Sequence, residues 1–209
     1  MPDAKPTEAK KPATVQVDSL ALWIEDLQKV RVKYLRDVAV PSGIRLRPGV
    51  LPEEGGVYAF WWTGERNLLK MATCNRDIVL VGPRGRPVAL HIDDHWLRLE
   101  SESPIPLYVG KNADSMAKRA GLHLCLGQKR ILPLGKKAEK AKARTTSCQL
   151  RAGIDHMFPH ESDTRSLTLN NVGFSYVLLD GDEHAANRFY LEDRAIGTMT
   201  PPFNIDVER

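Results

Sequence analysis

The chain has 209 residues, 42% of them hydrophobic and 27% charged, which is typical of a soluble globular protein. It contains no run of roughly 18–20 apolar residues that could span a bilayer and no apolar signal-peptide centre, so we expect a cytoplasmic protein without membrane contact. Cys74, Cys125 and Cys148 lie far apart, and their spacing indicates neither a zinc site nor a disulfide framework.

The charge is concentrated in one part of the chain. The chain has 30 Lys and Arg residues and 26 Asp and Glu residues, so its net charge is +4. Segment 129–144 alone has seven basic residues and one acidic residue. Such a segment attracts polyanions, but a solvated loop would have the same composition. The basic residues are Lys129, Arg130, Lys136, Lys137, Lys140, Lys142 and Arg144.

The first predicted elements follow residues 1–15, which are rich in Pro, Ala and Lys and which we expect to form a disordered tail. Residues 16–209 are expected to form a single domain. Apolar residues at helical spacing predict an N-terminal helix over 19–38, with Ser19 as its N-cap. A short β-rich run bounded by glycines then predicts a strand over 55–65.

The rest of the chain mixes predicted strands and helices. Residues 77–93 predict two strands joined by a turn that contains Arg84 and Arg86. Further elements are a strand at 106–111, helices at 113–126 and 146–157, a strand at 172–180, a helix at 183–197 and an extended segment at 200–206. Because no regular βαβ repeat appears, we expect an α+β fold with a small mixed or antiparallel sheet flanked by helices.

Two groups of side chains give weaker signals. Arg84 and Arg86 are suited to contact a nucleic acid, although an exposed turn would look the same. The histidines and aspartates of 91–95 have no further ligands at supporting spacing, so we interpret them as solvated polar residues. Trp61 and Trp62 are expected to pack on opposite faces of a strand.

The strongest signal is a series of short motifs in a fixed order. A glycine-x-tyrosine triplet and a tyrosine-x-glycine triplet lie in two predicted strands. An arginine and a histidine at positions i and i+4 share one face of a predicted helix. A glutamate in the last predicted helix is followed twelve residues later by an asparagine that comes shortly after two prolines. Each motif alone is common, but their joint order resembles the GIY-YIG nuclease family. The residues concerned are Gly56, Tyr58, Tyr108, Gly110, Arg119, His123, Glu192 and Asn204.

The resemblance covers about residues 55–65 and 105–206. Tyr58 and Tyr108 lie 50 positions apart, whereas the family usually joins the two strands by a short connection. An insertion over about 63–104 must therefore lie within the hairpin, where flanking strands can remain paired. The resemblance assigns no function to this insertion.

The resemblance implies a nuclease that depends on Mg²⁺ or Mn²⁺. Glu192 offers the hard oxygen ligand that Mg²⁺ prefers, and Arg119 is suited to hold the scissile phosphate. In the family a tyrosine of these motifs orients or activates the water, which implies Tyr58, with Tyr108 beside it. Positive charge from Lys111 and Arg119 would help a tyrosine to act as a base.

Two further residues complete the implied site. His123 resembles a histidine of some family members and is expected to share proton transfer or bind phosphate. Asn204 is expected to tie the glutamate helix and the last strand to the site by hydrogen bonds. Which tyrosine or histidine is the general base stays open.

The single-domain length, the arginine-to-histidine spacing and the enlarged hairpin favour the compact type II restriction endonucleases within the family. Arg84 and Arg86 would then read guanine edges of double-stranded DNA, and segment 129–144 would contact its phosphates. A palindromic target would favour a homodimer. The alternatives are a less specific DNA nuclease of phage, plasmid or repair origin, and an inactive DNA-binding protein on the same fold.

Overall fold

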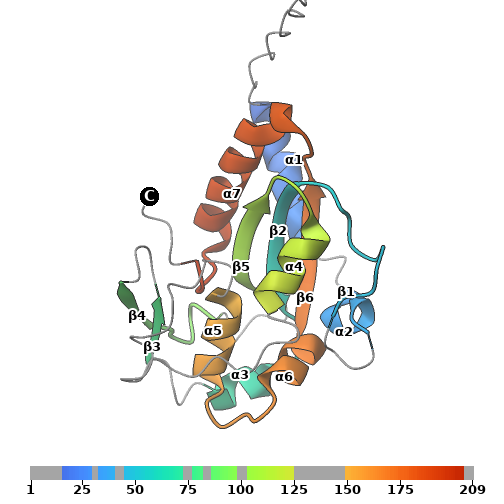
Figure 1. The fold of residues 1–209 in the computed structure, drawn as a ribbon. Coiled ribbons are helices and arrows are strands. Elements are labelled where there is room, and N and C mark those ends of the chain that lie inside the picture. The colour runs from blue at the N-terminus through green and yellow to red at the C-terminus, as the bar shows by residue number, and fades with distance from the viewer. Residues whose placement is uncertain are drawn as a thin grey trace, which may run out of the picture.

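The fold is α+β and is built around a fully buried central strand, β2 (Gly56–Trp62). In the computed structural model, β2 pairs antiparallel with β6 (Val172–Leu178) and with β5 (Ile105–Asn112). The short strand β1 (Lys33–Tyr34) lies along the outer side of β6, which gives the sheet order β1-β6-β2-β5 (Figure 1). The structure describes residues 16–29, 33–40, 45–72, 77–81, 86–97, 103–124 and 149–204.

The sheet separates two hydrophobic cores, because successive side chains of a strand point to opposite faces. Tyr58, Phe60 and Trp62 belong to one core, and Trp61 belongs to the other. Both tryptophans are buried, so the expectation that they pack on opposite faces is confirmed. Figure 1 shows α4 crossing in front of the sheet and α1 lying behind it.

Helices from distant parts of the sequence cover the two faces. On the Tyr58 face the core receives residues from α2 (Leu35–Val38), α3 (Arg66–Ala72), α4 (Met116–Leu124), α5 (Gln149–Met157) and α6 (Thr164–Asn171). On the Trp61 face it receives residues from α1 (Val17–Gln28) and α7 (Ala185–Met199). Among the described residues, no helix is long and apolar enough to cross a bilayer.

The long insertion between the tyrosine strands leaves their pairing intact. Residues 63–104 contain α3 and a separate antiparallel pair, β3 (Asp77–Val81) and β4 (Pro87–His91). The two predicted strands of 77–93 are therefore confirmed, as is the antiparallel pairing of β2 with β5 around the insertion. The hairpin lies beside α5 (Figure 1).

The helix predicted over 19–38 is wrong in its extent. The helix α1 begins at Val17 after Gln16, so Ser19 lies inside its first turn, and it ends at Gln28. The apolar residues Leu20, Ile24 and Leu27 are all on this part and face the core. Beyond it, Lys33 pairs with Phe174 of β6, and this long-range backbone pairing replaces the helix.

Two other parts of the chain differ from expectation. The helix α6 was not predicted, although Asp163 caps it by accepting a hydrogen bond from the Ser166 amide. The segment expected to be extended over 200–206 forms a turn at 202–203, where the Asn204 amide donates to the Pro201 carbonyl. The final helix is preceded by the short 3-10 turn η5 (Asp182–His184).

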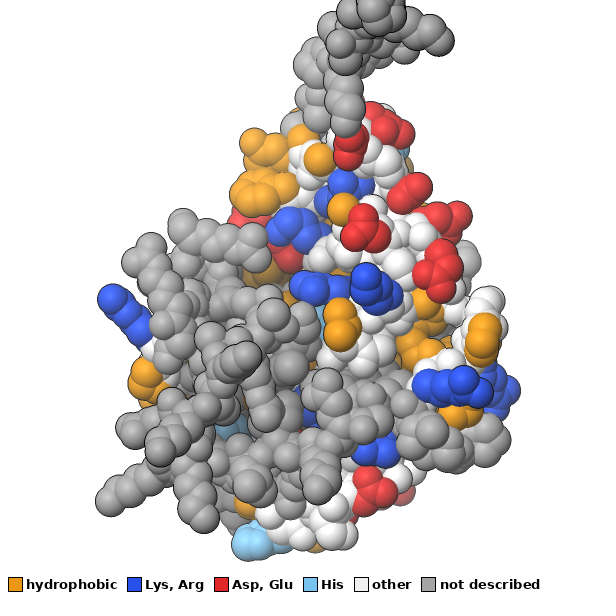
Figure 2. All heavy atoms as spheres, viewed as in Figure 1, with side chains coloured by type: hydrophobic (Ala, Val, Ile, Leu, Met, Phe, Trp, Pro, Cys, Tyr) orange, Lys and Arg blue, Asp and Glu red, His pale blue; other side chains and the backbone are white. Residues whose placement is uncertain are grey.

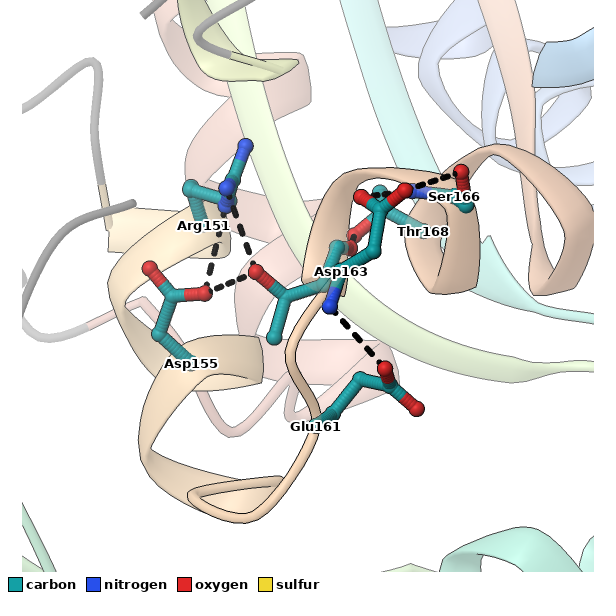
Figure 3. A network of polar contacts seen from close by, with 7 residues as sticks. Arg151, Asp155, Glu161, Asp163, Ser166 and Thr168 are labelled. Carbon is teal, nitrogen blue, oxygen red and sulfur yellow. Dashed lines mark hydrogen bonds and ion pairs between the residues drawn. The ribbon is translucent and has the colours of Figure 1, made fainter. Parts of the chain in front are cut away.

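A buried polar network joins α5 to the start of α6 (Figure 3). Arg151 Nε lies 3.3 Å from Asp155 Oδ1, and Arg151 Nη2 donates to Thr164 Oγ1 at 3.1 Å. The Thr164 hydroxyl in turn donates to Asp155. The side chains of Arg151 and Asp155 are only 3% and 1% exposed, so the two charges neutralise each other away from water.

Candidate active site

The glycine of the tyrosine-x-glycine motif makes room for the tyrosine of the other strand. Gly110 lies directly opposite Tyr58 in the β2–β5 pairing. A Cβ atom at Gly110 would lie 2.5 Å from Tyr58 Oη and 2.7 Å from Tyr58 Cζ, closer than real contacts allow. The Tyr58 ring therefore crosses the edge strand β5 at the point where β5 has no side chain.

The glycine of the first motif has a similar steric reason. A Cβ atom at Gly56 would lie 2.1 Å from the Val177 carbonyl oxygen and 2.7 Å from Met116 Cε. Glycine thus lets β2 approach both β6 and the start of α4 closely. Both motif glycines position strands and helices around Tyr58.

The helix α4 brings the arginine and the histidine to Tyr58. Ser115 precedes this helix, and its Oγ accepts a hydrogen bond from the Lys118 amide, which is the geometry of an N-cap. Four residues apart on the helix, Arg119 and His123 both face the sheet. His123 Nε2 lies 2.6 Å from Tyr58 Oη, and the Arg119 side chain also forms a hydrogen bond with Tyr58.

His123 lies inside the core and not at the surface. It has no exposed area, and its ring centroid is 4.7 Å from that of Tyr108 and 5.4 Å from that of Phe60. Burial, and secondarily the charge of Arg119, lowers the pKa of His123 to about 3. The imidazole is therefore neutral at neutral pH, and the expectation that it contacts phosphate does not fit this buried position.

Tyr58 is also fully buried, and its proton is held firmly. Burial raises the pKa of Tyr58 well above its ordinary value, whereas the charge and the hydrogen bond of Arg119 oppose this effect. The nearby Glu192 raises the pKa further, but by a smaller amount. Tyr58 is thus a neutral hydrogen-bonding group between Arg119 and His123.

The glutamate reaches the same place from the opposite face of the sheet. The helix α7 packs against β5, and Glu192 Oε2 forms an ion pair with Lys111 Nζ at the end of that strand. The side chains of Lys111 and Glu192 are 25% and 16% exposed, so this part of the site touches solvent. Lys111 Nζ also lies 5.4 Å from the centroid of the Phe189 ring.

Asn204 holds the segment that follows α7 against the edge strand. Its side-chain amide donates to the Val109 carbonyl and accepts from the Val109 amide, both at 2.7 Å. The Phe203 amide donates to the Leu107 carbonyl at 3.1 Å. These bonds pair backbone groups on the outer side of β5, so Asn204 ties the segment after α7 to the edge strand β5. The sequence predicts a tie to the last strand, which is β6, and the structure places this tie at β5 instead.

Glu192 is the residue of the site that is suited to bind a divalent metal ion. Its carboxylate is a hard oxygen ligand, half-buried beside Tyr58, and Mg²⁺ often binds through one or two carboxylates and several waters. One of its oxygens pairs with Lys111, so a bound ion would share Glu192 with this lysine. No group of three or more His, Cys, Asp or Glu residues arranged for a metal occurs in the part of the chain that the structure describes.

The seven residues expected at the catalytic site therefore lie in one region. They come from β2, β5, α4, α7 and the turn after α7: Tyr58, Tyr108, Lys111, Arg119, His123, Glu192 and Asn204. Arg86 is exposed directly before β4, outside this cluster. Arg84, the basic segment 129–144, the three cysteines and the tail 1–15 lie outside the described residues.

Sequence reasoning missed the aromatic pair Phe189 and Tyr190, which precedes Glu192 by one turn of α7. Two adjacent aromatic residues in a helix next to the predicted metal ligand were the available signal. Both side chains are exposed because the opposite face of α7 packs on the sheet.

Comparisons with models of protein families and with curated proteins found no match to this chain.

Proposed function

We propose that this protein is a Mg²⁺-dependent endonuclease of the GIY-YIG type that hydrolyses phosphodiester bonds of double-stranded DNA. The observation that supports it best is the meeting of the seven candidate catalytic residues, separated by up to 146 positions in the sequence, around one Tyr58–His123 pair. Independent surface or core residues would have no reason to converge in this way. The proposal extends to a sequence-specific type II restriction enzyme.

The charges of the site suit a phosphodiester substrate. Arg119 and Lys111 supply positive charge next to a single carboxylate, which is the combination needed to bind a phosphate and to stabilise the extra negative charge of its transition state. Arg119 is held in place by Tyr58, and Lys111 by Glu192. When bound at Glu192, the metal ion would act as a Lewis acid on the phosphate and its leaving oxygen.

Tyr58 and His123 are best understood as a positioning pair in the free protein. Both groups are neutral, and one proton lies between Tyr58 Oη and His123 Nε2. The pair fixes the phenol oxygen, and the phenol oxygen orients the Arg119 guanidinium. For Tyr58 to act as a general base, DNA binding must bring further positive charge to the phenol.

Sequence specificity would come from parts of the chain outside this cluster. Arg86 on the inserted hairpin is exposed, and a two-stranded ribbon has the dimensions to enter a DNA major groove. The basic segment 129–144 would contact backbone phosphates. A palindromic target would be cut by a homodimer, with one site for each strand.

The test is incubation of the purified protein with plasmid DNA and Mg²⁺. Discrete fragments are expected for a restriction enzyme. A continuous smear would instead indicate a less specific nuclease, and intact plasmid with a retained gel shift would indicate an inactive DNA-binding protein. Intact plasmid without a gel shift would contradict the proposed function altogether.

A further inference from the structure

Two adjacent aromatic side chains lie exposed on α7. Phe189 is 50% exposed and Tyr190 is 47% exposed, and their rings meet edge to face with centroids 5.4 Å apart. Figure 2 shows a group of hydrophobic side chains over the N-terminal half of α7. Large aromatic side chains are usually buried, so an exposed pair indicates a surface that contacts another molecule.

The aromatic pair borders the candidate active site. Phe189 precedes Glu192 by three residues, so the two side chains are neighbours on the helix surface. The Phe189 ring also lies under the ammonium group of Lys111, the residue that pairs with Glu192. A phosphate held between Lys111 and Arg119 would therefore place the adjoining nucleotide within reach of Phe189.

The charge on the exposed side of α7 is mixed. Arg194 follows Tyr190 by four residues and is exposed, and Asp193 follows Phe189 by four residues and is also exposed. Basic side chains attract the phosphates of a nucleic acid, and aromatic rings stack on its bases. The aromatic rings and their two neighbouring cations, Lys111 and Arg194, suit a nucleic acid better than a purely apolar partner.

We infer that Phe189 and Tyr190 form a stacking platform for a base next to the cleaved phosphodiester bond. Because the two rings lie at 85° to each other, the base stacks on the face of one ring and is bordered by the other. This inference rests on the proposed nuclease function. Bases inside a duplex are already stacked on both faces, so the platform requires a nucleotide that has left the helical stack. The substrate is therefore DNA that is locally opened at the cut, either by the protein or beforehand.

Photochemical crosslinking tests this inference directly. Wild-type protein is mixed, without divalent metal, with duplex DNA in which thymine is replaced by 5-iodouracil, and is irradiated and digested with trypsin. Cleavage after Arg188 and Arg194 releases residues 189–194 as one peptide. We expect the DNA crosslink on this peptide, at Phe189 or Tyr190.

Variants separate stacking from general effects on the protein. Phe189→Ala and Tyr190→Ala should each lose the crosslink at the altered residue. The variant that removes the stacked ring should weaken DNA binding by about tenfold, because an aromatic ring contributes substantially to each stacked base. Phe189→Trp should retain binding. Leu22→Ala removes an apolar side chain of similar exposure from α1 and should leave binding unchanged.

The possible failures are distinguishable. Wild-type protein that does not bind DNA would contradict the proposed function and the inference together. Wild-type protein that binds DNA but crosslinks elsewhere, with full binding by both alanine variants, would overturn only the inference. Conversion of a dimer to a monomer by Phe189→Ala in sedimentation, with DNA contact unchanged, would overturn it in favour of an interface between copies of the chain.

Discussion

The protein contains two buried polar clusters that are organised differently. In the network between α5 and α6, the opposite charges of Arg151 and Asp155 neutralise each other and share the Thr164 hydroxyl. Around Tyr58 and His123, two neutral groups are buried beside the Arg119 guanidinium, and the ionisation of both is displaced far from its ordinary range. The first arrangement connects two helices, whereas the second keeps Tyr58 and His123 neutral over a wider pH range than usual.

This difference separates a structural role from a chemical one. A paired charge network stabilises the protein only while both partners are present, and its removal should affect folding. Strongly displaced pKa values near a partly exposed ion pair are typical of functional sites. Mutations in the first cluster should therefore change mainly stability, and mutations in the second should change activity and the dependence of stability on pH.

The largest effect on stability is expected from Arg151→Met. It leaves the Asp155 carboxylate buried without its partner, which costs about 3–5 kcal/mol in the free energy of unfolding. Urea denaturation would measure this loss. Lys29→Met removes an exposed ion pair with Asp26 and should cost only about 0–1 kcal/mol. Equal effects of the two substitutions would contradict a stabilising role of the buried network.

A smaller loss of stability, together with a loss of activity, is expected from Gly110→Ala. The new methyl group would displace the Tyr58 ring, and overpacking of this kind costs about 1–3 kcal/mol. Gly197→Ala in α7 is the matched control, because its Cβ position meets no atom within 4 Å apart from the backbone of its own helix, and alanine stabilises a helix by about 0.5–1 kcal/mol relative to glycine. Full cleavage activity by Gly110→Ala would show that the position of Tyr58 is not required.

The next prediction concerns the pH dependence of stability. His123 has a pKa of about 3 in the folded chain and an ordinary value of 6.5. Between these values the unfolded chain binds a proton that the folded chain does not, so stability falls as the pH is lowered, by up to about 1.4 kcal/mol per pH unit. His123→Gln should flatten this dependence in urea denaturation. An unchanged slope would place the effect elsewhere, for example at His156, whose pKa burial also lowers.

Local sequence patterns were sufficient to predict the strands and helices that form the site. The runs around Tyr58 and Tyr108 predicted β2 and β5, and the helical spacing around Arg119 and Glu192 predicted α4 and α7. Gly110 explains why the motif could be recognised, since only glycine leaves room for the Tyr58 ring. The tyrosine-x-glycine motif in the sequence and the contact between Gly110 and Tyr58 in the structure thus have the same steric cause.

Long-range packing determined what the sequence did not indicate. The helix expected over 19–38 stops at Gln28 because Lys33 pairs with β6, a strand about 140 residues away. The spacing of Arg119 and His123 predicted a shared helix face, but it did not indicate that this face points into the core. Exposure of Phe189 and Tyr190 likewise depends on which side of α7 packs on the sheet.

The central claim is that the cluster around Glu192 cleaves DNA, and a comparison of two neighbouring substitutions tests it most directly. Glu192→Gln removes the negative charge of the site, whereas Asp193→Asn removes an equivalent charge from the exposed side of α7. With plasmid DNA and Mg²⁺, we expect Glu192→Gln to bind DNA without cutting it and Asp193→Asn to cut like the wild type. Undiminished cleavage by Glu192→Gln would contradict the assignment of the active site.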